Sequence, residues 1–125
     1  MIKLKRVYVE PAVEDGRRIL VERLWPRGMS KDKIKIDEWM KDLAPSGSLR
    51  RWFSHDPEKW QEFRSRYRKE LEPKTSELKR LAEMAKRGDI TFVYSARDEQ
   101  HNNAVVLKEL LEEIVMHKLD SYDED

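Results

Sequence analysis

The sequence contains no cysteine and no long apolar run. Without cysteine, disulfide bonds, thiol nucleophiles and cysteine-based zinc or iron–sulfur sites are excluded. No stretch approaches the about 18 consecutive apolar residues that a transmembrane helix needs, so we expect no membrane association. The N-terminal stretch 1–6 alternates as a strand does and lacks the apolar core of a signal peptide. We therefore expect a cytoplasmic protein.

Glycine and proline are also few. Four glycines and five prolines among 125 residues leave no stretch that resembles a flexible linker. A chain of this length supports one hydrophobic core but not two. We expect a single domain over residues 1–119, followed by an acidic tail over residues 120–125.

Charged residues, by contrast, are abundant, at 41% of the chain against about 25% in average proteins. The 26 basic and 25 acidic side chains nearly balance, which predicts a surface rich in ion pairs. Such surfaces are typical of proteins from hot environments, although a mesophilic source fits as well. Residues 1–98 carry 24 basic and 17 acidic groups, whereas residues 99–125 carry two and eight. The basic body either attracts phosphates or nucleic acid or is simply a solvated surface.

Apolar runs and turn residues predict alternating strands and helices. The runs 18–24 and 90–94 indicate strands buried on both faces, and a third strand is expected at 2–9. Residues 34–36 are expected to be extended. In the first half of the chain we expect a helical turn capped by Ser30, a short helix with Asp37 as N-cap, and a short helix at 49–53. A helix at 57–71 is expected after the start signal Asp56-Pro57. It is followed by a helix that is capped by Thr75 or Ser76 and ends at Gly88, and by a long helix after residue 103. This order predicts an α/β fold, a single compact domain with a small, mostly parallel sheet flanked by helices.

Both buried strands run into loops rich in polar residues. Pro26 and Gly28 would present Arg27 on a stiff loop after the first strand, and Ser95 opens the loop after the second. In open α/β sheets, ligands bind outside the carboxyl ends of the strands. If the two strands are parallel, four side chains should converge on one concave surface: Arg27, Arg50, Ser95 and His101.

Two charges interrupt the first apolar run. Glu22 and Arg23 fall inside the expected strand 18–24, and a buried charge must be paired or must point into a site. A structural ion pair and a functional placement are both open at this point.

Arginines dominate the candidate ligand-binding residues. Guanidinium groups bind phosphate and carboxylate in a bidentate way, and the N-terminus of the final helix would add backbone donors. Neither a P-loop nor a glycine-rich dinucleotide motif is present. The alternative is that these arginines form ion pairs with Glu22, Asp37 or Asp98. The expected ligand-binding residues are Arg23, Trp25, Arg27, Arg50, Arg97 and Asn102.

One loop holds a hydroxyl, a carboxylate and an imidazole, on Ser95, Asp98 and His101, which suggests a hydrolase. The loop lacks a nucleophile elbow, so capping of the final helix by Ser95 or Asp98 is the competing interpretation. Glu22 is a candidate for orienting a ligand or acting as a base. The candidate catalytic residues are therefore Glu22, Ser95, Asp98 and His101.

Metal and cofactor sites receive little support. His55, Asp56 and His101 could meet at a metal, but three histidines and no cysteine leave too few ligands. We expect no metal, and the sequence identifies no cofactor. The four tryptophans could stack on a nucleobase, whereas aromatic side chains more commonly fill the core. They are Trp25, Trp39, Trp52 and Trp60.

Six groups of residues form a recognisable pattern along the chain: Lys5-Arg6-Val7-Tyr8, 18–28, Asp37-Glu38-Trp39, Ala44-Pro45-Ser46 with Leu49-Arg50, Trp52-Phe53-Ser54-His55-Asp56, and Tyr94-Ser95-Ala96-Arg97-Asp98 with His101-Asn102. Together they resemble the DUF488 family of small YeaO-like proteins, in the right order and over nearly the whole chain. Glu10 and Glu22 stand where relatives tend to carry Asp. The resemblance implies a compact α/β domain without a settled activity, cofactor or substrate.

Three functions follow from these observations. The leading one is a polar, arginine-rich pocket that binds an anionic or nucleotide-like small molecule, with catalysis left open. The second is a nucleic-acid- or protein-binding module that uses the arginine face of the helix 57–71. The third is a structural protein whose unusual charges are ion pairs.

Overall fold

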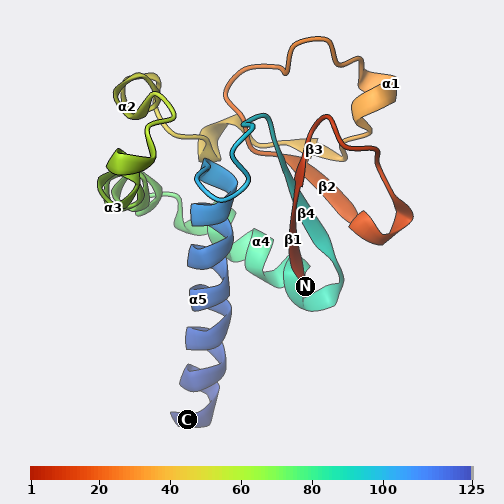
Figure 1. Ribbon diagram of the computed structural model, residues 1–125. Coiled ribbons are helices and arrows are strands. Elements are labelled where there is room, and N and C mark those ends of the chain that lie inside the picture. Colours follow the sequence, from red (N-terminus) through yellow and green to blue (C-terminus); the bar gives the residue numbers. More distant parts are fainter. Residues whose placement is uncertain (125) are drawn as a thin grey trace.

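Four strands and five α-helices make up the part of the chain that the structure describes (Figure 1). This computed structural model describes the backbone of residues 1–124 and the side chains of residues 1–116. Along the chain the elements are β1 (Ile2–Arg6), β2 (Arg17–Leu20), α1 (Lys31–Ile34), β3 (Glu38–Trp39), α2 (Gly47–Phe53), α3 (Trp60–Leu71), α4 (Thr75–Arg87), β4 (Ile90–Tyr94) and α5 (Asn103–Glu124). Short 3₁₀ turns cover Val13–Asp15, Lys41–Leu43 and Pro57–Lys59.

The strands form one parallel sheet in the order β1-β4-β2-β3. β4 pairs with β1 on one side and with β2 on the other, so β1 and β2 are not adjacent in the sheet. Because all four strands are parallel, their carboxyl ends meet at one edge of the sheet, here called the carboxyl edge. The predicted α/β class and the predicted parallel direction of β2 and β4 are confirmed.

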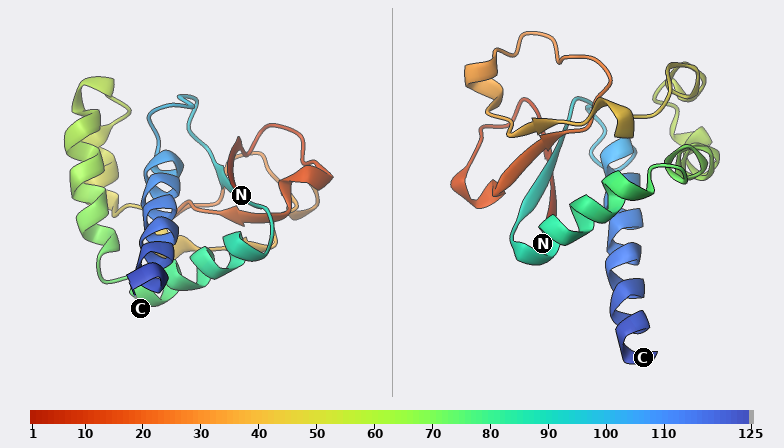
Figure 2. Two further views of the ribbon diagram at one scale, coloured as in Figure 1. Left: turned by 90° about the horizontal axis from the view of Figure 1, so that it is seen from below. Right: turned by 180° about the vertical axis from the view of Figure 1, so that it is seen from behind.

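The two faces of the sheet are covered differently. Ile19 and Phe92 point into a large core formed with the helices α2 to α5, whereas the next residues, Leu20 and Val93, point into a smaller cluster with Ile34. Successive residues of a strand face opposite sides, which explains this division. Figure 2 shows α2 to α5 on one side of the strands and α1 with its flanking loops on the other.

Local sequence signals account for most of the helices. Ser30 caps α1 by accepting a hydrogen bond from the Lys33 N–H, as predicted. Asp56 caps the 3₁₀ turn that leads into α3, with Pro57 at its first position. The helix predicted at 57–71 buries one apolar face, since Phe63, Tyr67 and Leu71 are buried and Trp60 packs beside them.

Two strands are shorter than predicted. β2 ends at Leu20 rather than at residue 24, and the last backbone bond along it joins the Val21 N–H to the Val93 carbonyl. Beyond that point β4 itself ends, so the chain has no further partner and turns away. Glu22 and Arg23 therefore lie past the strand, where charges are tolerated. The strand predicted at 2–9 ends at Arg6 for the same reason, and Tyr8 and Val9 are exposed.

The helix predicted after Asp37 is wrong. The Asp37 N–H donates to the Arg18 carbonyl, and its carboxylate accepts from the Arg18 N–H, both at 2.8 Å. The chain then forms β3, which pairs with β2 from Ile19 to Leu20. β2 offered an open edge there, and backbone pairing along that edge outweighs a local capping signal.

Two smaller predictions also fail. The segment 34–36 is not a continuous extended piece, because Ile34 ends α1 and Lys35 is left-handed with φ 48°. Neither Thr75 nor Ser76 caps α4, since the helix already begins at Thr75, behind Lys74, with no side-chain cap. Gly88 does follow its last residue, as predicted.

The backbone of α5 continues to Glu124, and residue 125 and the side chains from 117 onward lie outside the described residues. The division into a domain over 1–119 and a tail over 120–125 therefore stays a prediction. None of the helices in the described part of the chain has the length and apolar character that a membrane span requires.

Candidate functional site at the carboxyl edge

Glu22 is the centre of the candidate site. It lies two residues beyond β2, and its Oε1 accepts a hydrogen bond of 2.8 Å from the backbone N–H of Ser95, the first residue after β4. The Glu22 carbonyl accepts a second bond, of 2.6 Å, from the indole N–H of Trp39 at the end of β3. The ends of three parallel strands thus hold Glu22 at the carboxyl edge, with one bond to its carboxylate and one to its main-chain carbonyl.

The surroundings of Glu22 perturb its ionisation. Burial raises the pKa of the half-buried Glu22 carboxyl, while the Ser95 N–H and the positive charge of Arg50 oppose that rise without cancelling it. A carboxyl group in this environment takes up a proton more readily than an exposed glutamate does. Such groups occur both at functional sites and in structural networks.

Arg50 reaches this site from α2. Ser46 caps that helix by accepting from the Leu49 N–H, and Ser46 is itself held by the Glu70 carboxylate of α3, which accepts from its N–H at 2.8 Å and from its hydroxyl at 2.7 Å. Arg50 lies one turn into α2 and is half-buried. Among the described side chains no carboxylate hydrogen-bonds its guanidinium group, although the charge of Glu22 is close enough to interact.

Sequence reasoning missed two polar residues next to Glu22. The Tyr67 hydroxyl donates to the Leu43 carbonyl inside the core, and the amide nitrogen of Asn103 donates to the Val21 carbonyl at 2.6 Å. Burial and then the charge of Glu22 raise the pKa of Tyr67. The available signal was the hydroxyl itself, because a buried tyrosine needs a hydrogen-bond partner.

Asp98 and His101 form a close pair at 2.8 Å between Asp98 Oδ2 and His101 Nδ1. The other carboxylate oxygen accepts from the N–H groups of Gln100 and His101, and these bonds, with the imidazole, hold the pKa of Asp98 below its usual range. No hydrogen bond within the described residues joins Ser95 to His101. Ser95, His101 and Asp98 therefore do not form the relay that the hydrolase interpretation requires.

Asn102, predicted to bind a ligand, caps α5. Its amide nitrogen donates to the Asp98 carbonyl, and its amide oxygen accepts from the Val105 N–H. The side chain is buried, with 3% of the residue exposed. As the capping interpretation predicts, a polar side chain of this loop caps the final helix, but that side chain is Asn102 rather than Ser95 or Asp98.

The remaining arginines divide into anchored and exposed ones. Arg23 donates from Nε to the Pro45 carbonyl at 3.2 Å. Arg27 and Arg97 are exposed and have no ion-pair partner among the described residues. The Arg27 carbonyl accepts from the Tyr8 hydroxyl, which places Arg27 at the carboxyl edge beside the end of β1. No contact in the described part joins it to Arg50 or Ser95, so convergence on one surface stays a prediction.

The tryptophans serve mainly as packing groups. Trp25 donates to the Met29 carbonyl and lies edge-on to Trp39, at 5.3 Å between ring centroids, and both pack on the smaller cluster. Trp60 packs on the large core and meets the His101 ring edge-on at 5.1 Å. Trp52 lies under the guanidinium group of Arg66 at 4.2 Å. These contacts favour the core interpretation over base stacking.

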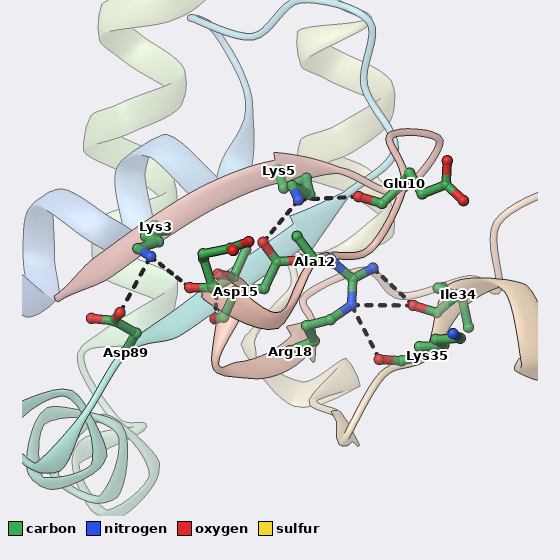
Figure 3. Close-up of polar contacts among 11 residues, drawn as sticks. Lys3, Lys5, Glu10, Ala12, Asp15, Arg18, Ile34, Lys35 and Asp89 are labelled. Carbon is green, nitrogen blue, oxygen red and sulfur yellow. Dashed lines mark hydrogen bonds and ion pairs between the residues drawn. The ribbon is translucent and has the colours of Figure 1, made fainter.

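A second group of buried charges has a structural role (Figure 3). Asp15 pairs with Arg18 at 2.6 Å and with Lys5 at 2.8 Å, and it also accepts from the Ala12 N–H. Arg18 donates its remaining bonds to the carbonyls of Ile34 and Lys35. Because the carboxylate oxygens and the guanidinium group all have protein partners, little capacity is left for a ligand, and the group joins β1, β2 and the end of α1.

Ion pairs also occupy the arginine face of α3. Arg64 pairs with Glu109 at 2.6 Å and Arg68 with Glu113 at 2.9 Å, so both reach across to α5. Arg66 pairs with Glu62 on its own helix. The face proposed for nucleic-acid binding is therefore largely used in holding two helices together.

The arrangement offers no metal centre within the described residues, where no group of three or more histidine, aspartate or glutamate side chains is placed to hold an ion. His55 is exposed and left-handed with φ 57°. The carboxyl edge instead offers one half-buried carboxyl, one half-buried guanidinium group and an aspartate–histidine pair, a set that can bind an anion and exchange protons.

Comparison with known proteins assigns this chain to a family. The model of the family described as "Inactive DUF488-N3 subclade" matches residues 1–124, and the chain belongs to the DUF488 family. It is 44% identical over 110 residues to the uncharacterized protein YeaO of Escherichia coli, covering 88% of this chain and 96% of that protein. It is 40% identical over 110 residues to the uncharacterized proteins Mb3100c of Mycobacterium bovis and Rv3073c of Mycobacterium tuberculosis, with 88% of this chain and 92% of each relative covered. No solved structure gives a significant match.

Proposed function

We propose that the carboxyl edge binds a small molecule carrying a phosphate or carboxylate group, and that Arg50 is the main contact of that anion. The observation that carries the proposal is the half-buried Arg50, which acts on Glu22 through its charge yet has no carboxylate hydrogen-bonded to it among the described side chains. A guanidinium group in this state keeps its paired donors for a planar anion. Arg97, two residues after Ser95, and Arg27 at the same edge are the proposed outer contacts.

We propose binding without turnover. The matching family model carries the word "inactive" in its description. In addition, Ser95 has no hydrogen bond to His101 in the described part of the chain, which leaves its hydroxyl without a base. The Asp98–His101 pair would then exchange protons with a bound ligand or solvent and would not activate a nucleophile.

The test is calorimetry and thermal shift with inorganic phosphate, AMP and citrate on the wild-type protein and on two matched variants. Arg50→Gln removes the proposed contact, and Arg51→Gln removes the same charge from the exposed neighbour on α2. At least one probe should bind the wild type, and Arg50→Gln should weaken it about tenfold or more, or about 1.4 kcal/mol. Arg51→Gln should leave it unchanged. No binding by any probe, or equal losses in both variants, would contradict the proposal.

A nucleic-acid-binding function is the second candidate, and one observation favours it. A cavity of about 330 Å³ opens between α2 and α3, lined by Ser48, Leu49, Trp52, Arg66, Lys69 and Glu70. Its lining includes Lys69, which has no ion pair among the described residues, next to the Trp52 ring with Arg66 stacked on it, and a cation beside aromatic groups suits a single strand. Anisotropy of a labelled single-stranded RNA should then fall steeply with salt and respond to Lys69→Gln. RNA binding that changes neither with salt concentration nor with the Lys69→Gln substitution would exclude this candidate.

A further inference from the structure

The two oxygens of the Glu22 carboxylate have different surroundings. Oε1 accepts from the Ser95 N–H at 2.8 Å, whereas no donor among the described residues reaches Oε2. In the described side chains, Arg64 Nε is the one buried nitrogen or oxygen atom that lacks a hydrogen-bond partner. Oε2 is not among such atoms, so it keeps some exposure to solvent and an unused acceptor position.

The neighbouring protein donors are already occupied. The Tyr67 hydroxyl donates to the Leu43 carbonyl, and the Asn103 amide donates to the Val21 carbonyl. Arg50 acts on Glu22 through its charge but forms no hydrogen bond with it. A hydrogen-bond donor to Glu22 Oε2 must therefore come from a bound molecule or from water.

We propose that Glu22 selects ligands that carry a hydroxyl group close to their anionic group, such as sugar and polyol phosphates. The hydroxyl donates to Oε2 while the phosphate meets Arg50, and the Ser95 hydroxyl, which has no hydrogen bond in the described part of the chain, can pair with a second ligand hydroxyl. This inference rests on the proposed function. Arg50 would bind the anionic group of the ligand, and Glu22 would distinguish ligands that carry a hydroxyl group from those that do not.

A hydroxyl group is a suitable donor for Oε2, and it is the donor that sugar and polyol phosphates carry next to their anionic group. A hydroxyl donating to a carboxylate forms a charge-assisted hydrogen bond, which is roughly twice as strong as a neutral one. The partial burial of Glu22 strengthens this bond by excluding competing water.

The experiment compares three phosphate monoesters by calorimetry at neutral pH: glycerol 3-phosphate, n-propyl phosphate and O-phosphoethanolamine. The first two share a three-carbon skeleton, and the second lacks the hydroxyl groups. The wild type should bind glycerol 3-phosphate about tenfold more tightly than n-propyl phosphate, as expected for one good hydrogen bond. Glu22→Gln should reduce that ratio and Glu22→Met should abolish it, while n-propyl phosphate binds both variants at least as well as it binds the wild type.

Each other outcome is informative. Equal binding of glycerol 3-phosphate and n-propyl phosphate by the wild type would overturn the role of Glu22 while leaving the anion site intact. A ratio that survives in Glu22→Met would place the hydroxyl contact elsewhere, and a preference for O-phosphoethanolamine would assign a cationic donor to Oε2. Failure of all three esters and of the earlier anions would overturn the anion site itself. Circular dichroism verifies that both variants are folded.

Discussion

Gly16 lies directly against the carbonyl group of Asp89: a Cβ atom built on Gly16 would come within 2.1 Å of that oxygen. The contact occurs where β2 begins, and the Arg17 N–H donates to the same carbonyl at 3.1 Å. Gly16 also has φ +64°, in the left-handed region. The approach of two chain segments 73 residues apart thus depends on the absence of a side chain at one position.

Gly16→Ala should therefore destabilise the protein strongly, by about 3 kcal/mol or more, because backbone strain and a steric clash with the main chain act together. Gly28→Ala is the matched control. Gly28 has φ +74° but open space around the missing Cβ, so only strain of about 1–2 kcal/mol is expected. Urea unfolding monitored by tryptophan fluorescence measures both. Similar losses in the two variants would show that the contact with Asp89 is unimportant.

Glu22→Gln should raise the stability of the protein at neutral pH. Burial raises the pKa of Glu22 in the folded state, and the Ser95 N–H and Arg50 only partly oppose it, so the folded protein binds the proton more tightly than the unfolded chain does. Stability therefore falls as pH rises from the unfolded pKa through the folded one, and the loss is complete above both. Glutamine keeps an acceptor for the Ser95 N–H without the charge.

The check is thermal unfolding of the wild type and Glu22→Gln between about pH 3 and pH 8. The advantage of the variant should be present at neutral pH and should disappear below the pKa of an ordinary glutamate, where both proteins carry a neutral side chain. An advantage that is the same at every pH would have to arise from packing instead.

Asp15→Asn should cost about 3–5 kcal/mol, because it leaves the buried Arg18 without its counter-charge. Burial alone would raise the pKa of Asp15, but hydrogen bonds from Lys5, the Ala12 N–H and Arg18 outweigh it and lower the pKa. The stability contributed by the ionised form is therefore present above the ordinary carboxyl pKa and is lost as pH falls through the lower, folded one.

Urea unfolding at pH 7 and at progressively lower pH measures this dependence. Glu14→Gln is the control, since Glu14 is an exposed neighbour without an ion pair among the described residues. It should change stability by less than about 0.5 kcal/mol. Equal effects of Asp15→Asn and Glu14→Gln would exclude a special role for the buried pair.

The ion pairs between α3 and α5 should contribute little each and should respond to salt. Glu109→Gln removes the partner of Arg64, which pairs at 2.6 Å on a half-exposed surface, and is expected to cost about 0.2–1 kcal/mol at low salt and less at about 1 M salt. Glu112→Gln, exposed on the same helix, should cost less. A loss that does not change with salt would indicate packing of the glutamate side chain as its cause.

The parts of the fold that could be predicted from sequence depend on local signals. Residues 90–94 are all β-branched or aromatic, which favours a strand, and every residue of β4 is buried. Ser30 and Asp56 cap their turns because a side chain two or three residues away in sequence suffices for a cap. β3 has no such signal: its two residues are extended because β2 offers them an edge, and that edge exists only in the folded sheet.

Several residues of the candidate site could be predicted from the sequence, but the contacts between them could not. Glu22 was selected because a charge interrupted an apolar run, and the predicted parallel direction of β2 and β4, which is confirmed, brings the loops after both strands to one edge. Its bond to the Ser95 backbone and the nearby charge of Arg50 depend on long-range contacts that no spacing reveals. The bond from the Tyr67 hydroxyl to the Leu43 carbonyl likewise joins positions that are distant in sequence.

The central position of β4 has a consequence for how the chain folds. β1 and β2 are made first, yet each pairs with β4, whose residues begin at Ile90. During synthesis β1, and the edge of β2 that faces β4, stay unpaired until more than two thirds of the chain has been made. α3 and α4, whose backbone hydrogen bonds are local, can form in the meantime, and the sheet closes in one late step that depends on long loops. The carboxyl edge, and every residue proposed to bind there, comes into existence only with that last strand.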